Sequence, residues 1–189
     1  MDYKFLFKRL LLIVFKPAEA WKEIKSGEET IKITRNYFLL PFSVLAAIAA
    51  FLGSILFTDA EFTLSYHILA ALKFLFLPGI VVYCSAVIIK EITYPLDLGR
   101  SFPIAFQLVS YSLIPFFICL LISNVFESLI FINIIGLFGL NIFWTGDATF
   151  LAPPEHQRIP LVIASLLVIA TLWISFSWLL SMFVERIYS

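Results

Sequence analysis

Charged side chains are scarce in this sequence. Only 14% of its 189 residues are Asp, Glu, Lys or Arg, whereas 61% are hydrophobic and 21 residues are Phe. Soluble domains carry about 25% charged residues and need them to cover a surface that faces water. A water-soluble globular fold is therefore excluded, and the sequence predicts an integral membrane protein.

Several chemical signatures are also missing. The 13 basic residues balance the 13 acidic ones, so there is no net charge to attract nucleic acid. The sequence has no phosphate-binding or dinucleotide-binding glycine motif and no nucleophile within a known catalytic motif. It has only two Cys and two His, without metal-ligand spacing. We therefore expect no enzyme activity, no metal and no cofactor.

Five apolar runs reach the length of about 20 residues that a helix needs to cross a bilayer. They are continuously apolar, whereas the strands of a membrane barrel would alternate between apolar and polar residues. The predicted fold class is all-α, a polytopic bundle of five transmembrane helices. The runs cover Tyr37 to Phe57, His67 to Ile89, Pro103 to Ile122, Val125 to Trp144 and Pro160 to Val184.

The positions of the basic residues predict the orientation of these helices. Eight Lys and Arg precede the first run, and none lies between the first and the second. Along the whole chain, alternate segments carry eleven basic residues on one side and one on the other, with Lys73 inside a run. Basic residues are retained in the cytoplasm, so we expect a cytoplasmic N-terminus and a C-terminus on the outside.

Residues 1–36 form a separate segment ahead of the membrane domain at residues 37–189. Lys8 and Arg9 interrupt its first apolar run, so we do not expect a cleaved secretory signal. The segment predicts two short amphipathic helices at the membrane surface, the second with Ala18, Trp21 and Ile24 on one face. The alternative is that it only anchors the first span. The candidate interfacial residues of the second helix are Pro17, Trp21, Lys22, Ile24 and Lys25.

The stretch from Phe15 to Ile24, followed by Tyr37 to Pro41 at the start of a span, resembles bacterial Yip-domain proteins, the Ypt/Rab-interacting membrane family. Ser101 and Phe102 together with Ser110 to Pro115 resemble the third span of that family, and Gly139 to Pro154 resembles its fourth span with the short cytoplasmic loop that follows. The resemblance implies five spans and a cytoplasmic N-terminus. It also implies a role in membrane shape or trafficking, because eukaryotic members affect vesicle budding at Golgi and endoplasmic-reticulum membranes.

Those eukaryotic members carry a long hydrophilic region before the first span, where this chain has 36 residues. The short form resembles prokaryotic members, so we expect location in the bacterial inner membrane and do not expect binding of a Rab-type GTPase. The partners that remain are the lipid bilayer, anionic lipids and other membrane proteins.

Two charged residues are predicted to lie within the outer half of the membrane. Lys73 is inside the second run, and Glu127 is at the start of the fourth. We hypothesise that they form an ion pair across the bundle. Such residues are functional candidates by default, but a structural pair, or a lysine that extends to the interface, would give the same pattern.

Prolines interrupt two of the runs. Pro78 and Gly79 lie in the middle of the second run and Pro115 in the middle of the third, where each proline removes a backbone hydrogen bond and bends the helix. Such breaks either build a ligand site or are packing kinks. If a cavity exists, its candidate polar lining is Gln107, Ser110, Tyr111 and Ser112.

Two further patterns have structural interpretations. Small residues recur in the first run at Ala46, Ala50 and Ser54, and they predict a close contact with another helix of the chain or with a second copy. Asp147, with Glu155 and His156, is expected in a solvated cytoplasmic turn.

Two hypotheses for function remain. The first is a non-enzymatic membrane protein that organises lipids or partner proteins, with its basic N-terminal helices bound to the anionic leaflet. The second is a small transporter or channel, which the proline breaks and the pair of Lys73 and Glu127 would favour.

Overall fold

The computed structural model describes residues 3–27, 29–57 and 64–188, and every element within these ranges is helical. In chain order the elements are α1 (Tyr3–Phe15), α2 (Pro17–Ser26), α3 (Ile31–Thr34), the π-helix η1 (Arg35–Leu39), α4 (Leu40–Phe57), α5 (Leu64–Thr93), the 3₁₀ helix η2 (Tyr94–Leu96), α6 (Phe102–Ser112), α7 (Ile114–Val125), the 3₁₀ helix η3 (Glu127–Phe138), α8 (Gly139–Phe150) and α9 (Glu155–Tyr188).

Four continuous helices are long and apolar enough to cross a membrane, or five if the bent pair α6–α7 counts as one span. The continuous ones cover Ile31–Phe57, Leu64–Leu96, Ser128–Phe150 and Glu155–Arg186. The helical fold class is confirmed. Helices suit this composition because every backbone N–H and C=O group is paired within its own segment, as a lipid environment requires.

The third predicted span is broken. α6 and α7 meet at Leu113 with an angle of 43° between them, and Pro115 lies in the first turn of α7. Proline suits a first turn because the N–H that it lacks has no partner there in any case. The bend lies at mid-bundle, where α6 meets the N-terminal helices and α7 continues along α4.

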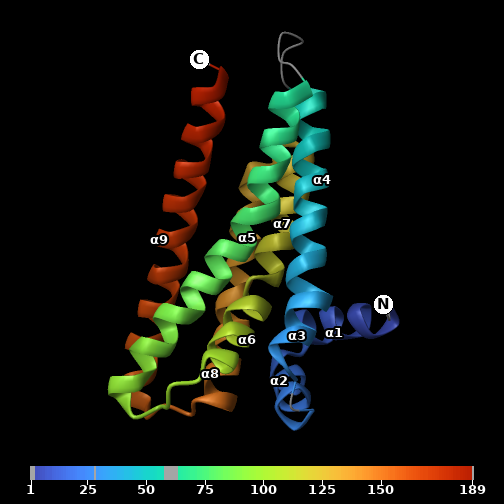
Figure 1. The fold of residues 1–189 in the computed structure, drawn as a ribbon. Coiled ribbons are helices and arrows are strands. Elements are labelled where there is room, and N and C mark those ends of the chain that lie inside the picture. The colour runs from blue at the N-terminus through green and yellow to red at the C-terminus, as the bar shows by residue number, and fades with distance from the viewer. Residues whose placement is uncertain (1–2, 28, 58–63, 189) are drawn as a thin grey trace.

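The long helices run roughly side by side, and α1 lies across their direction near one end of the bundle (Figure 1). α2 lies at that same end, whereas the C-terminus of α9 lies at the opposite end (Figure 1). The upper part of α9 stands away from α7 in this view. The apolar core joins α2, α4, α5, α6, α7 and α8.

Small residues bring α4 against α7, which decides between the two contacts that the sequence left open. Ala46, Ala49, Ala50 and Gly53 are buried. A Cβ atom on Gly53 would overlap the backbone oxygen of Asn124 in α7, so only glycine permits this approach. The small-residue pattern is therefore a contact within the chain.

Candidate functional site

Trp21 fixes α2 to the membrane domain. Its side chain is fully buried, and its indole Nε1 donates a hydrogen bond to the carbonyl oxygen of Ile142 at 2.8 Å. The ring makes edge-to-face contacts with Tyr111 and Phe150, with centroid distances of 5.6 and 5.7 Å. Gly146 provides the space, since a Cβ atom there would lie 2.6 Å from the indole. A residue expected at the membrane surface thus packs inside the protein.

A buried polar cluster lies beside Trp21 and is centred on Glu29, whose side chain is 5% exposed. The hydroxyl of Tyr111 donates to Oε2 of Glu29 at 2.7 Å, and Arg9 donates to Oε1 at 2.5 Å. Arg9 also contacts Glu23 at 3.2 Å. Nε2 of Gln107 donates to the backbone oxygen of Glu29 at 2.5 Å. We call these five residues, Arg9, Glu23, Glu29, Gln107 and Tyr111, the Glu29 cluster.

The Glu29 cluster connects four parts of the chain. Arg9 comes from α1, Glu23 from α2, Glu29 from the link before α3, and Gln107 and Tyr111 from α6. Both oxygens of the buried carboxylate accept a hydrogen bond, which offsets the free energy cost of removing the charge from water. These contacts hold α1 and α2 against the bundle, and none of them is the pairing of a nucleophile with a base.

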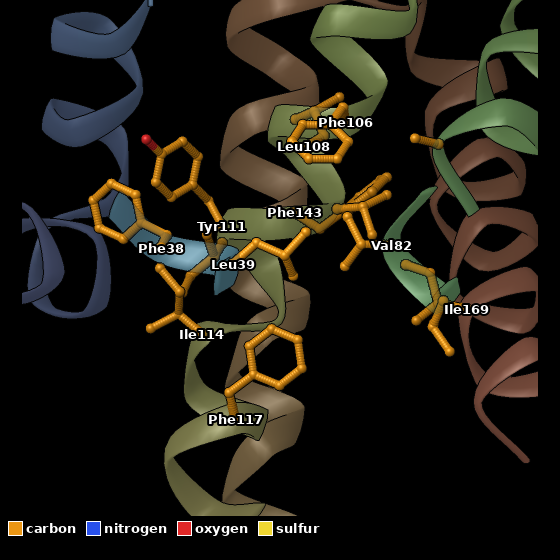
Figure 2. Packing of buried hydrophobic residues seen from close by; sticks show 14 of the residues in the cluster. Phe38, Leu39, Val82, Phe106, Leu108, Tyr111, Ile114, Phe117, Phe143 and Ile169 are labelled. Carbon is orange, nitrogen blue, oxygen red and sulfur yellow. The ribbon is translucent and has the colours of Figure 1, made fainter. Parts of the chain in front are cut away.

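Tyr111 also belongs to the apolar core. Its ring packs against Phe38 at a centroid distance of 4.8 Å, and Figure 2 shows the two side chains next to each other above Ile114 and Phe117. Only the hydroxyl leaves this core to reach Glu29. Tyr111 thereby joins the apolar packing of α6 to the polar contact with the N-terminal segment.

The four residues proposed as polar lining are all buried but do not share one cavity. Gln107 and Tyr111 belong to the Glu29 cluster. The hydroxyls of Ser110 and Ser112 have no hydrogen-bond partner among the described residues. Ser112 lines an apolar cavity at the bend, where its carbonyl oxygen lies so close to Gly139 that a Cβ atom would overlap it.

The other proline position lies in a continuous helix. α5 extends from Leu64 to Thr93 through Pro78 and Gly79, so the chain is not interrupted there as it is beside Pro115. Pro78 is buried, and nothing lies within 4 Å of a Cβ atom placed on Gly79. Close packing therefore does not require glycine at position 79.

Lys73 has a partner on α9. Its ammonium donates to the hydroxyl of Ser181 at 2.7 Å and lies 5.1 Å from the centre of the Phe74 ring. The side chain of Glu127 lies outside the described part of the structure, so the ion pair between the two stays a prediction.

The interpretation of Asp147 as part of a solvated turn is wrong. α8 continues to Phe150, six residues beyond the predicted end of the fourth span, and Asp147 is fully buried in it. Its carboxylate lies 3.6 Å from the guanidinium of Arg158, which also stacks 3.9 Å from the centre of the Trp144 ring. Glu155 and His156 are exposed as expected. The difference arises because the helix continues past the predicted end of the span, which carries Asp147 into the bundle beside the cationic Arg158. Neither carboxylate oxygen accepts a hydrogen bond from the described residues.

The second predicted interfacial helix, α2, buries a different face from the one expected, and it buries that face against the protein instead of the membrane. Ala20, Trp21 and Ile24 are buried against the protein, while Ala18 is exposed. Pro17 begins the helix, and Lys22 and Lys25 are exposed on it. Nζ of Lys25 donates to the carbonyl oxygen of Thr149 at 2.6 Å. α2 thus turns its apolar face to the bundle and its lysines outward.

α1 keeps an apolar surface that the chain does not cover. Phe7, Leu11 and Phe15 recur every four residues, so they share one face of the helix, and they are 63%, 44% and 76% exposed. Lys8 and Lys16 are exposed beside them. We call Phe7, Leu11 and Phe15 the α1 stripe. Its opposite face carries the buried Arg9 and Ile13.

The comparison with known families agrees with this architecture. A model of the Yip1 domain matches residues 11–182, which is nearly the whole chain. The chain belongs to the Yip1 domain family. No curated protein and no solved structure matches this Yip1 domain chain. The matched range includes α2, the broken α6–α7 span and most of α9, so Trp21 and most of the Glu29 cluster fall within the Yip1 domain.

Sequence reasoning identified two members of the Glu29 cluster, Gln107 and Tyr111, and missed Arg9, Glu23 and Glu29. The available signal was an arginine inside the apolar run of α1. An arginine there needs a carboxylate partner if it is buried. The choice between the nearby acidic residues depends on the folding of α1 and α2 and is not visible in the local sequence. Among the described residues no group of three potential metal ligands occurs.

Proposed function

We propose that this Yip1 domain protein is a non-enzymatic organiser of the membrane, which acts through its N-terminal helices on the lipids of the cytoplasmic leaflet of the bacterial inner membrane. The observation that carries the proposal is the α1 stripe, an exposed apolar face on a helix that lies across the direction of the spans (Figure 1). A helix in this position lies parallel to the membrane plane, so its apolar face is available to the acyl chains near the headgroups.

Electrostatic attraction supports the same contact. Five lysines are exposed on or next to the N-terminal helices: Lys8, Lys16, Lys22, Lys25 and Lys32. A lysine near an anionic leaflet contributes about 1 kcal/mol of attraction. Together with the α1 stripe, these lysines would enrich anionic lipids at this end of the protein.

The Glu29 cluster and Trp21 hold the N-terminal helices rigidly, so that the contact of the α1 stripe with lipid can change membrane shape. A freely attached amphipathic helix adjusts to the membrane, whereas α1 is held at a set angle by Arg9, Glu29 and Tyr111. Rigidly placed apolar side chains that enter one leaflet spread its lipids and favour curvature. Protein partners recruited to the same surface would meet a defined arrangement of helices.

The test uses the full chain in vesicles of phosphatidylcholine with and without phosphatidylglycerol. Replacing the α1 stripe by serine (F7S, L11S, F15S) should abolish most of the change in vesicle shape that the wild-type protein produces, as seen by electron cryomicroscopy. Each removed side chain forfeits roughly 1.5–3 kcal/mol of apolar contact. The wild-type effect should be larger with phosphatidylglycerol.

The matched control keeps the face apolar through F7L, L11F and F15L, and it should behave like the wild type. Thermal unfolding verifies that the serine variant is folded, which we expect because these side chains are exposed. Vesicles that have the same shape with the wild type, the serine variant and no protein would refute the proposal.

A further inference from the structure

Two adjoining cavities lie between α9 and the rest of the bundle. The first, of about 310 Å³, is bounded by the α6–α7 bend, η3, the start of α8 and α9. The second, of about 410 Å³, lies between α4, α5, α7, η3 and α9. Asn133 and Trp173 line both of them. The second cavity includes the last turns of α4 and the first turns of α5, which form the end of the bundle away from α2 (Figure 1).

The two cavities differ in polarity. The first is lined almost entirely by apolar side chains, among them Ile169, Phe116 and Trp173. The rings of Phe116 and Trp173 meet edge to face at a centroid distance of 4.8 Å. The second contains five neutral polar side chains, which are Ser54, Ser123, Asn124, Asn133 and Ser177. No Asp, Glu, Lys or Arg occurs among the described residues that line either cavity.

The polar end holds two amide side chains, of which that of Asn133 is satisfied within the protein and that of Asn124 keeps a donor without an acceptor among the described residues. Nδ2 of Asn133 donates to the hydroxyl of Ser123 at 3.2 Å and to the carbonyl oxygen of Ile130 at 3.0 Å. Nδ2 of Asn124 is buried and has no acceptor within the described ranges. A buried amide without an acceptor costs free energy, and the hydrocarbon region supplies no water to satisfy it. An oxygen that accepts without donating would complete this site.

From the mid-bundle towards the end opposite α2, the lining changes from apolar to neutral polar. A glycerolipid in the leaflet at the end opposite α2 shows the same change from apolar to polar. Its acyl chain lies near the bilayer centre and its ester carbonyl lies nearer the surface. We propose that one ester-linked membrane phospholipid binds here, with an acyl chain in the first cavity and an ester carbonyl oxygen that accepts from the buried amide Nδ2 of Asn124.

The dimensions and the chemistry of the cavities fit this occupant. Volumes of about 310 and 410 Å³ lie in the range of roughly 300–1,000 Å³ that is typical of small-molecule sites, which are mainly apolar with a few placed polar groups. Ionisable side chains within a membrane mark ion pathways, and none occurs among the described residues that line these cavities. The site lies apart from the α1 stripe, so it goes beyond the proposed function and its failure would leave that function untouched.

The test uses the full chain in nanodiscs that contain a phospholipid with a diazirine in its acyl chain. After illumination, peptide mass spectrometry should find labels on the walls of the first cavity, near Phe116 and between Ile169 and Trp173. An unlabelled diester phospholipid should compete up to about tenfold better than the diether lipid of the same chains and headgroup, because an ether oxygen is the weaker acceptor.

Two matched variants locate the site. Ala170 lines the first cavity, so A170W should fill it and lower the labelling of its walls about tenfold, which corresponds to a weakening of one decade in affinity. Thr171, the next residue, is exposed and lines neither cavity, and T171W should leave the labelling unchanged. N124L should remove the preference for the diester lipid while the protein stays folded.

Several results would overturn the proposal. These are labels spread evenly over the lipid-facing surface of α9, equal loss in A170W and T171W, or equal competition by the diester and diether lipids in the wild type. If A170W does not fold, as judged by size-exclusion chromatography, the competition experiment on the wild-type protein still decides.

Discussion

The buried carboxylate of Glu29 joins the N-terminal segment of this protein to the middle of a membrane span, beside the contact that Trp21 makes. Glu29 accepts hydrogen bonds from Tyr111 in α6 of the bundle and from Arg9 in the N-terminal helix α1. The aromatic ring of Tyr111 is meanwhile surrounded by Trp21 and Phe38. A substitution at this residue can therefore remove the polar contact and leave the apolar one in place.

We expect Y111F to destabilise the protein by about 1–3 kcal/mol, because an oxygen of the buried Glu29 carboxylate loses its donor while the ring keeps its packing. The measurement is thermal unfolding of the purified protein in mild detergent. Y94F is the matched control, since Tyr94 is 62% exposed, and it should change the stability by no more than about 0.5 kcal/mol. Equal stabilities of Y111F and Y94F would show that the hydrogen bond to Glu29 contributes nothing.

At the level of whole elements, glycines determine how closely helices approach. Gly146 in α8 lies under the indole of Trp21, so α2 can dock there only if position 146 has no side chain. Gly79 in α5 is also helical, yet it faces open space. Replacing glycine by alanine should therefore destabilise the protein at position 146 and stabilise it at position 79.

G146A should push Trp21 and α2 away from α8, since a Cβ atom there would lie 2.6 Å from both the indole and Leu108. Overpacking of this kind costs roughly 1–3 kcal/mol. Limited proteolysis should then cut the links around α2 more readily than in the wild-type protein. G79A should leave these links protected and stabilise α5 by up to about 1 kcal/mol, the difference in helix propensity between the two residues. Equal protection of the α2 links in G146A and G79A would contradict the docking of Trp21.

Over the whole molecule, the N-terminal helices and the C-terminus lie at opposite ends of the bundle (Figure 1). The basic residues concentrate at the end with α1 and α2, which is the end that the charge distribution assigns to the cytoplasm. The predicted orientation also determines which leaflet each proposed contact would reach. The α1 stripe would meet the cytoplasmic leaflet, and the phospholipid site would open towards the outer one.

Reporter fusions test the orientation directly. Green fluorescent protein fluoresces in the cytoplasm but not after it has been exported in an unfolded state. It should therefore be bright when fused to the N-terminus and dark when fused to the C-terminus. Alkaline phosphatase, which is active outside the cytoplasm, should show the reverse pattern. Activity of the same reporter at both ends would contradict an odd number of spans.

The sequence alone was enough to establish the class of protein, the helical fold and the approximate ends of the long helices. Each of these depends on properties that are local along the chain. An apolar segment in lipid must satisfy its own backbone hydrogen bonds, so length and hydropathy suffice to predict a helix. The bend beside Pro115 and the small-residue face of α4 followed from local sequence, whereas the choice of α7 as the partner of that face did not.

The tertiary structure decided everything that depends on two distant segments. Trp21 reaches Ile142, and Glu29 reaches Tyr111, across 121 and 82 residues of chain. No periodicity in the sequence encodes such a pair, because the partner depends on how α2, α6 and α8 pack. The same physics explains why Asp147 is buried: its helix continues, and Arg158 comes close enough to pair with it only in the folded bundle.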